Sequence, residues 1–236
     1  MSDAGRTDDE VAAYWDRQYR AGGALWGDVP SELAAIAVAR LGALGPAVAD
    51  LSLLDLGCGY GRDAVALWDA LRLSVVAVDG AARAIEMARA ARPAGAAIEY
   101  RCGDLGDLGE SGRPPGGSRS DRFDVVYCSN VYQLLDPVAR AALRATVADR
   151  LASGGLFFMS TLSYRDPEHA GRGRPVAGEP DSYVERTYLH FCRRDELERD
   201  FGFLRLERLD ETAYREPRPD GAPHEHVSWI VIGRAL

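Results

Sequence analysis

Short apolar runs alternate with longer stretches of helical pattern along most of the chain. Seven runs of five to seven residues are rich in Val, Leu, Ile and aromatic residues, which is typical of buried strands. These runs cover residues 51–56, 74–78, 97–102, 123–129, 156–161, 204–209 and 227–233. Stretches with apolar residues at helical spacing cover 11–19, 31–42, 62–71, 81–92, 137–151 and 194–201. Strands that alternate with helices in this way predict a parallel sheet with helices on both faces.

The order of these elements predicts a doubly wound, Rossmann-like α/β fold. Its sheet would hold seven strands and be mostly parallel. The last two runs, 204–209 and 227–233, follow one another without a helix between them. We therefore expect a hairpin-like pair, with the last strand antiparallel. Ser31, directly after Pro30, is expected to cap the helix that runs to Gly42.

Two polar segments interrupt the alternation. Residues 109–121 are rich in Gly, Pro, Ser and Arg, which predicts a loop. Residues 163–186 form a longer polar insertion after the fifth strand. Ligands of open α/β sheets bind beyond the carboxyl ends of the strands. The insertion is therefore either a wall of the substrate site or a solvated surface loop.

The first strand ends in a turn with three glycines spaced by two, Gly57, Gly59 and Gly61. Glycine has no Cβ and tolerates positive φ, so such a turn can wrap closely around a ligand. We predict that it holds a nucleoside-containing cofactor. Cys58, between the glycines, is better explained as a small filler than as a nucleophile.

The residues around the turn restrict which cofactor it can take. Arg62 stands where a dinucleotide-binding GxGxxG motif has its last glycine, which disfavours NAD and FAD. No Gly-Lys-Ser/Thr follows the turn, which excludes a phosphate-binding P-loop. Asp55 lies two residues before the turn, where its carboxylate would repel a pyrophosphate and suit a cationic group.

Carboxylates also end the next two strands. Asp79, followed by Gly80, could accept both hydroxyls of a ribose, although alone it could simply cap the helix that follows. Asp104 could take an adenine amino group, with Leu105 against the ring. Carboxylates at three successive strand ends favour a cationic adenosyl cofactor.

At this point the chain resembles the class I S-adenosylmethionine-dependent methyltransferases over about residues 50–160. The resemblance rests on five segments in family order, 55–61, Asp79, 104–105, 123–130 and 151–156. It implies that 46–236 form the methyltransferase domain and that S-adenosylmethionine is the cofactor. It also implies that the glycine turn contacts the amino-acid part of the cofactor, Asp79 the ribose and Asp104 the adenine, and that Asn130 lines the methyl-transfer site.

The N-terminal segment carries three aromatic residues, Trp15, Tyr19 and Trp26, in a pattern similar to the thiopurine, thiol/halide and tellurite methyltransferase group. That resemblance implies that residues 1–45 form a helical lid over the active site. The alternative is an amphipathic helix that packs its aromatic residues on the domain.

The acceptor is best explained as a small molecule, with a thiol, chalcogen, amine or hydroxyl nucleophile. Methyl transfer from a sulfonium is an in-line displacement, for which alignment and exclusion of water can suffice. Catalytic candidates are Asn130, Tyr132 and His226, and His190 is a further candidate in the pocket. His224 and His226 alternate at the start of the last strand, either as a base or metal ligands or as ordinary polar residues. We expect no metal site.

Composition fits this hypothesis. The formal net charge is −8, and all 28 basic residues are Arg, so nucleic acid is disfavoured as a partner. No apolar run approaches the roughly 20 residues of a membrane helix, and the first ten residues are polar and acidic. The four cysteines have no metal spacing. We expect a cytoplasmic monomer or homodimer; the rival functions are a non-catalytic cofactor-binding scaffold and an NAD(P)-linked oxidoreductase.

Overall fold

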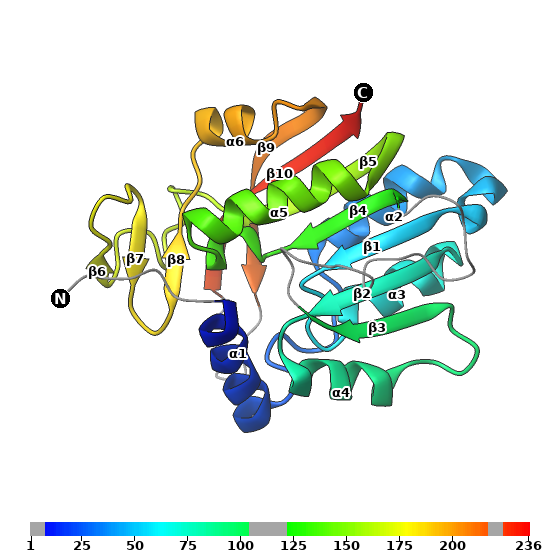
Figure 1. The fold of residues 1–236 in the computed structure, drawn as a ribbon, viewed down its shortest axis with the longest axis horizontal. Helices are drawn as coiled ribbons and strands as arrows, with labels where there is room; N and C mark the ends of the chain where they lie inside the picture. The colour runs from blue at the N-terminus through cyan, green and yellow to red at the C-terminus, as the bar shows by residue number, and fades with distance from the viewer. Residues whose placement is uncertain (1–7, 104–121, 217–223) are drawn as a thin grey trace.

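The computed structural model describes residues 8–103, 122–216 and 224–236. Its main sheet has seven strands in the order β3-β2-β1-β4-β5-β10-β9 (Figure 1). The strands are β1 (Ser52–Leu56), β2 (Ser74–Asp79), β3 (Ile98–Cys102), β4 (Phe123–Ser129), β5 (Leu151–Leu162), β9 (Leu204–Glu216) and β10 (His224–Ala235). The pairs among β1 to β5 are parallel, whereas β10 runs antiparallel to both β5 and β9. This confirms the predicted fold class.

Helices cover both faces of the sheet (Figure 1). One face carries α2 (Glu32–Gly42), α3 (Arg62–Leu71) and α4 (Ala82–Ala91), whose apolar residues share one core cluster. The other carries α5 (Pro137–Arg150) and α6 (Arg194–Asp200), which share a second cluster. The strands between them are buried on both faces and therefore read as continuous apolar runs. Two 3-10 helices, η1 (Gly45–Asp50) and η3 (Tyr132–Leu134), join the elements.

The N-terminal segment divides into two parts. Helix α1 (Asp8–Gly22) lies beyond the carboxyl ends of β2 and β3, beside α4 (Figure 1). Helix α2 instead belongs to the main core, where Leu33, Ala34, Ala37 and Leu41 are buried. Ser31 caps α2, since its hydroxyl accepts a hydrogen bond from Ala34 N at 3.2 Å. Only the part before α2 is thus placed to act as a cover.

The segment between β5 and α6, which includes the insertion at 163–186, contains regular structure that its sequence did not indicate. Strands β6 (Arg174–Pro175), β7 (Ser182–Val184) and β8 (Tyr188–His190) form a small antiparallel sheet, separate from the main one (Figure 1). Strands β5, β9 and β10 are also longer than the apolar runs that predicted them. The extra residues of β9 and β10 pair with each other, so their register depends on the partner strand rather than on apolar composition.

Polar side chains collect at one edge of the main sheet, on the face that α2 and α3 cover. The strand pairs Ser129↔Ser160 and Ser160↔Ile230 put these residues on one face, and Ser228 and His226 follow at alternate positions of β10. The same alternation puts Asp55 on the core face of Leu53 and Asp79 on that of Ala77. The carboxyl ends of the strands therefore present a continuous polar row on this face.

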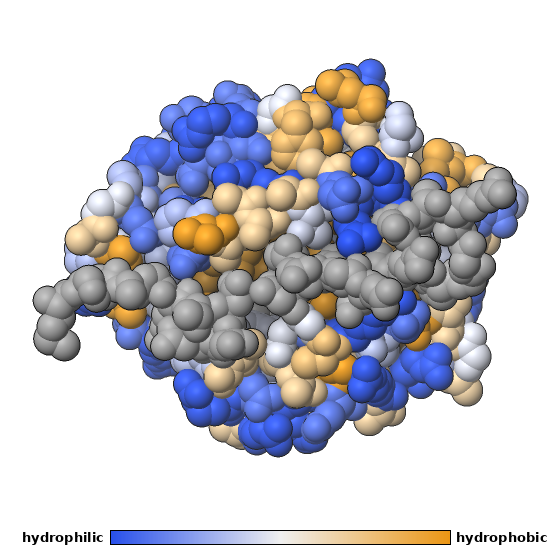
Figure 2. Space-filling model, in the orientation of Figure 1, coloured by the Kyte–Doolittle hydropathy of each residue, from blue (hydrophilic) through white to orange (hydrophobic). Residues whose placement is uncertain are grey.

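Among the described residues, no helix has the length and apolar character needed to cross a membrane. The face in Figure 2 carries apolar side chains as separate patches between polar ones.

Candidate active site

The glycine turn follows β1 directly and has a constrained backbone. Gly57, Gly59 and Gly61 have φ of 78°, 54° and 81°, all in the left-handed region that glycine favours. The amides of Gly57 and Cys58 both donate to Val78 O, at 2.8 and 3.0 Å, which ties the turn to β2. The backbone conformation of the turn is by itself enough to require glycine at these positions.

Side chains from distant segments lie against the turn. A Cβ on Gly57 would come within 2.3 Å of Val131 Cγ2, and one on Gly61 within 2.5 Å of Tyr100 Oη. Tyr100 is buried, and its hydroxyl has no hydrogen-bond partner. Sequence reasoning did not find Tyr100, because a tyrosine in a strand reads as ordinary core.

Asp79 holds the turn from the end of β2. Its Oδ2 accepts a hydrogen bond from Gly59 N and its Oδ1 one from Ala81 N, each at 2.8 Å. Burial raises the pKa of Asp79, while these two backbone bonds oppose the increase. The bond to Ala81 is the local, cap-like contact, and the bond to Gly59 joins the carboxyl group to the glycine turn.

Asp55 is a second buried polar group beside the turn that lacks a hydrogen bond. It is 2% exposed, and its Oδ2 is buried without a hydrogen-bond partner. Burial, together with the nearby Asp63 and Asp79, raises its pKa well above the usual value, and Arg62 offsets only part of this. A buried carboxyl group with an unused oxygen fits a cationic ligand group, which would supply the missing hydrogen bond and charge.

Cys58 shows the features of a filler. Its Sγ contacts Gly59 O at 3.5 Å, and burial, with Asp55 and Asp79 nearby, raises its pKa well above the usual value. The side chain is therefore a thiol, which is a poor nucleophile.

A second polar group joins α2, α3 and β4 on the same face. Asp63 of α3 is 7% exposed; its carboxylate accepts from Ser31 N at 2.9 Å, from Ser31 Oγ at 2.5 Å and from Tyr127 Oη at 2.8 Å. Sequence reasoning missed Asp63, although one signal was present: it shares the buried side of α3 with Leu67 and Leu71 at four-residue spacing. The arrangement fixes the start of α2 next to the glycine turn.

The carboxyl ends of β4 and β5 continue this group. Ser129 Oγ lies 3.3 Å from Ser31 Oγ and 3.3 Å from Ser160 Oγ. Asn130 has φ of 55°, and its amide donates to Ser160 O at 3.1 Å. Asn130 therefore lies in a sharp turn at the carboxyl end of β4, next to Ser160 of β5.

Aromatic rings of the N-terminal segment cover the glycine turn. Trp15 lies 6.3 Å from Tyr19 and 6.2 Å from Trp26, between ring centroids, and Tyr19 lies 6.1 Å from Tyr60 of the turn. Tyr60 Oη donates to Gly27 O at 2.6 Å, which fastens this segment to the turn. Trp26 remains 46% exposed. The three aromatic residues predicted for a lid are thus brought together over the turn.

Helix α1 lies over the end of β2. Arg83 N donates to Asp16 Oδ1 at 2.7 Å, and a Cβ on Gly80 would lie 3.1 Å from Ala12 Cβ. Gly80 therefore allows α1 to approach closely. Asp104 and Leu105, predicted to contact adenine, lie outside the described residues.

The central part of the chain is similar to a known protein family. Residues 53–155 match the family model described as a methyltransferase domain. Over these residues the chain carries a methyltransferase domain. Its fold is that of the class I, S-adenosylmethionine-dependent methyltransferases. No curated protein matches the chain.

Solved structures share the fold of this methyltransferase. One, from work on the conversion of a disulfide bond into a thioacetal group during echinomycin biosynthesis, is 23% identical with a TM-score of 0.69, over 95% of this chain and 91% of that one. Magnesium protoporphyrin IX methyltransferase from Synechocystis PCC 6803, with bound S-adenosylmethionine, is 17% identical with a TM-score of 0.67, over 100% of both chains. TehB from Haemophilus influenzae is 14% identical with a TM-score of 0.61, over 96% of this chain and 67% of that one.

Tyr132, a predicted catalytic candidate, points away from the glycine turn of the methyltransferase. It is fully buried; its Oη donates to Asp200 Oδ2 at 2.6 Å and accepts from Arg144 at 2.8 Å. Its ring packs on Phe201 in the cluster between the sheet, α5 and α6. This position is structural, and we give Tyr132 no part in the function proposed below.

His226 lies at the carboxyl edge, on the same face as the polar row. Its Nδ1 is 3.0 Å from Asp166 Oδ2 of the insertion, and its ring stacks on His169 with centroids 5.4 Å apart. Burial lowers the pKa of His169. The side chain of His224 lies outside the part of the chain that the structure describes.

His190 is buried between the small sheet and α6. Its Nε2 lies 2.8 Å from Glu196 Oε1, and its Nδ1 lies 2.9 Å from Ser182 Oγ. Both ring nitrogens thus have hydrogen-bond partners in the protein, and neither partner belongs to the glycine turn.

Proposed function

We propose that this methyltransferase transfers a methyl group from S-adenosylmethionine to a small-molecule acceptor bound beneath the N-terminal aromatic residues. The observation that carries the proposal is Asp55, a buried carboxyl group with an unused oxygen beside a turn of positive-φ glycines. The ammonium group of the cofactor would supply what Asp55 lacks. Asp79 would accept the ribose hydroxyls, and Asp104 and Leu105 would hold the adenine.

S-adenosylmethionine, when bound, supplies a methyl group on a positively charged sulfur. The residues of the chain then need to hold the acceptor in line and exclude water. The aromatic rings over the glycine turn would exclude water; they belong to Trp15, Tyr19 and Trp26. Ser129 and Asn130, at the end of β4, would border the acceptor.

A soft nucleophile such as a thiol or chalcogen anion suits this site best. The hydroxyls of Ser31, Ser129 and Ser160 are bonded to one another or to Asp63, so they are committed before an acceptor arrives. A thiol ionises near neutral pH and needs little help from a base. The fold likeness to TehB, and to the structure from the echinomycin thioacetal work, is in keeping with sulfur or chalcogen chemistry.

A hydroxyl acceptor is the second candidate. The observation that favours it is the His226–Asp166 pair, which lies on the same face of the sheet as Ser160. His226 would accept the proton that such an acceptor must lose. His226→Asn should then abolish transfer to hydroxyl acceptors and leave transfer to thiols unchanged.

The proposal is tested by calorimetric titration with S-adenosylhomocysteine and NADH, followed by mass spectrometry of an acceptor panel of thiols, amines and hydroxyls. We expect binding of the adenosyl compound alone and methylation of a thiol or chalcogen acceptor. Binding of NADH alone would contradict the cofactor assignment. Cofactor binding without methylation across the panel would favour a non-catalytic scaffold.

A further inference from the structure

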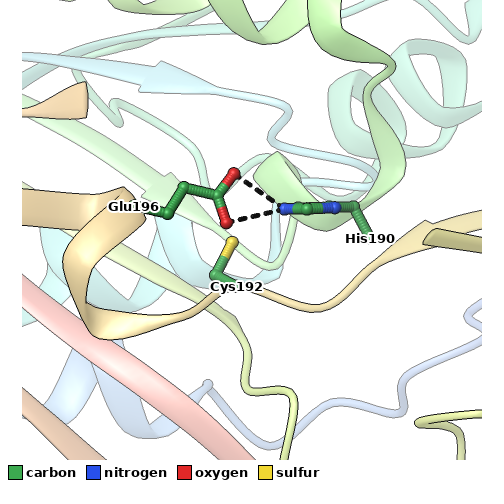
Figure 3. A group of neighbouring side chains, drawn as sticks. All are labelled: His190, Cys192 and Glu196. Atoms are coloured by element: carbon green, nitrogen blue, oxygen red, sulfur yellow. Dashed lines mark hydrogen bonds and ion pairs between the residues drawn. The ribbon is translucent and has the colours of Figure 1, made fainter. Parts of the chain in front are cut away.

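Three side chains of types that can bind a metal meet between β8 and α6, away from the glycine turn. His190, Cys192 and Glu196 each point a donor atom toward the others, and all these atoms lie within 4.8 Å of one another (Figure 3). The imidazole and carboxylate are in direct contact, with Nε2 2.8 and 3.0 Å from the two Glu196 oxygens. His190 is 4% exposed and Cys192 is fully buried.

The backbone that carries these residues is firmly held. Cys192 N donates to Leu162 O at 2.9 Å, and Cys192 O accepts from the indole of Trp229 at 2.9 Å. Ser182 Oγ, in β7, lies 2.9 Å from His190 Nδ1 and fixes the orientation of the ring. A second partner on the far nitrogen is the usual arrangement of a metal-binding histidine.

Hydrogen bonds from neighbouring elements support the group. Arg140 of α5 donates to Tyr188 Oη at 2.9 Å, and Tyr188 in turn donates to Glu179 at 2.7 Å. Tyr188 Oη also lies 3.1 Å from Ser182 Oγ, the group that bonds to His190 Nδ1. The residue that orients the His190 ring is therefore itself held in place.

We propose that His190, Cys192 and Glu196 bind a zinc ion, with water as the fourth ligand. Nitrogen, thiolate and carboxylate donors in a tetrahedral arrangement are the ligands that zinc prefers. Sequence reasoning predicts no metal site, because the cysteines follow no metal-binding spacing. The ion would fasten β8, which follows the insertion, to α6 and thereby hold the small sheet at the carboxyl edge of the main sheet.

Cobalt titration of the full chain, purified without a histidine tag and stripped with EDTA, tests the proposal. Cobalt(II) in the proposed site gives a thiolate-to-cobalt charge-transfer band, which a site built from histidine and carboxylate alone cannot give. We expect one cobalt per chain with this band and its loss when an equivalent of zinc is added. No band at saturating cobalt would overturn the site, and would leave His190 and Glu196 as a buried hydrogen-bonded pair.

Variants assign the band to these residues. Cys192→Ser should abolish it, whereas Cys102→Ser, which changes an exposed free cysteine, should leave it intact. If Cys192→Ser does not fold, Ser182→Ala provides the test: it keeps all three ligands and should weaken cobalt binding by about 10–100-fold, the usual effect of losing such a supporting hydrogen bond. A band that survives Cys192→Ser, or a cobalt affinity unchanged in Ser182→Ala, would contradict the proposal.

Discussion

The two ends of the polar row differ in how far their hydrogen bonds are satisfied. At the glycine turn, Asp55 keeps a buried oxygen without a partner. At the carboxyl ends of β4 and β5, Ser129 and Ser160 are bonded to each other, and the neighbouring Asp63 of α3 accepts four hydrogen bonds. A cationic ligand group would supply the partner that Asp55 lacks, whereas the hydroxyls of Ser129 and Ser160 are already bonded within the protein. This difference explains why the chain reveals its cofactor more readily than its acceptor.

A side chain added to the glycine turn should have the largest effect. In Gly57→Ala the new Cβ would meet Val131 at 2.3 Å, at a φ of 78°. We expect a loss of about 2–5 kcal/mol in the free energy of unfolding and no detectable binding of S-adenosylhomocysteine by calorimetry. Gly154→Ala is the matched control, because Gly154 has a φ of 73° but nothing within 4 Å. It should cost about 1–2 kcal/mol and keep full affinity.

Asp79→Ala removes the group that would hold the ribose. Charged hydrogen bonds contribute about 1.5–3 kcal/mol, so the affinity for S-adenosylhomocysteine should fall by about 10–100-fold. Calorimetric titration measures this. Asp69→Ala, on the exposed side of α3, should leave the affinity unchanged. Equal affinities for Asp79→Ala and the wild type would remove Asp79 from the site.

Asp55→Asn should have opposite effects on stability and on binding. The pKa of Asp55 is raised, so the folded state binds its proton more tightly than the unfolded state, and this contribution is lost as pH rises above the ordinary value of 3.8. The amide should therefore stabilise the ligand-free protein at neutral pH, and denaturant unfolding measures this.

Binding needs the carboxylate of Asp55. The affinity of the wild type for S-adenosylhomocysteine should rise with pH, with release of the Asp55 proton, and Asp55→Asn should bind about tenfold more weakly. Titrations in buffers of different ionisation enthalpy detect the proton. No proton release, with unchanged affinity in the variant, would mean that Asp55 meets no cation.

Trp26→Ala tests whether the N-terminal aromatic residues cover the acceptor. Trp26 contacts Trp15 and is 46% exposed, so its loss should disturb the cover more than the turn. We expect a roughly twofold change at most in S-adenosylhomocysteine affinity and a larger fall in kcat/KM for the acceptor that the panel identifies. Leu44→Ala, another exposed apolar residue, should change neither. Equal losses for cofactor and acceptor would make Trp26 part of the cofactor site.

Glu207 gives the smallest expected effect. It accepts from Arg234, Arg40 and Arg205 on the surface, and its pKa is lowered to about 2, chiefly by the bond from Arg234. Its contribution is present above the ordinary value of 4.5 and disappears as pH falls through about 2. Solvent screens such pairs, so Glu207→Gln should cost less than about 1 kcal/mol and leave cofactor binding unchanged; a change in binding would contradict this.

Periodicity predicted the central sheet and its helices closely, because each element there is apolar by its own local pattern. Helix α3 and strand β4 match their predicted bounds to the residue. The small sheet of β6, β7 and β8 was not predicted, since strands of only two or three residues depend on their partners rather than on composition. Asp55 and Asp79 could be located from sequence, because both end apolar strands.

The rest of the site depends on tertiary contacts. Asp63 and Tyr127 meet across 64 residues of chain, and no local pattern indicates such a pair. Tyr132 was a candidate because it follows β4, yet η3 turns its side chain into the core with Phe201. A strand end locates a residue on the correct edge but does not determine which way the next residues point.

A crystal structure of the chain with S-adenosylhomocysteine tests the central claim most directly. We predict that the amino group of the ligand lies within hydrogen-bond distance of Asp55 Oδ2, that its ribose hydroxyls contact Asp79, and that its sulfur faces Ser129 and Asn130 beneath the N-terminal aromatic residues. A ligand bound elsewhere, or one whose amino group leaves Asp55 Oδ2 unpaired, would contradict the account.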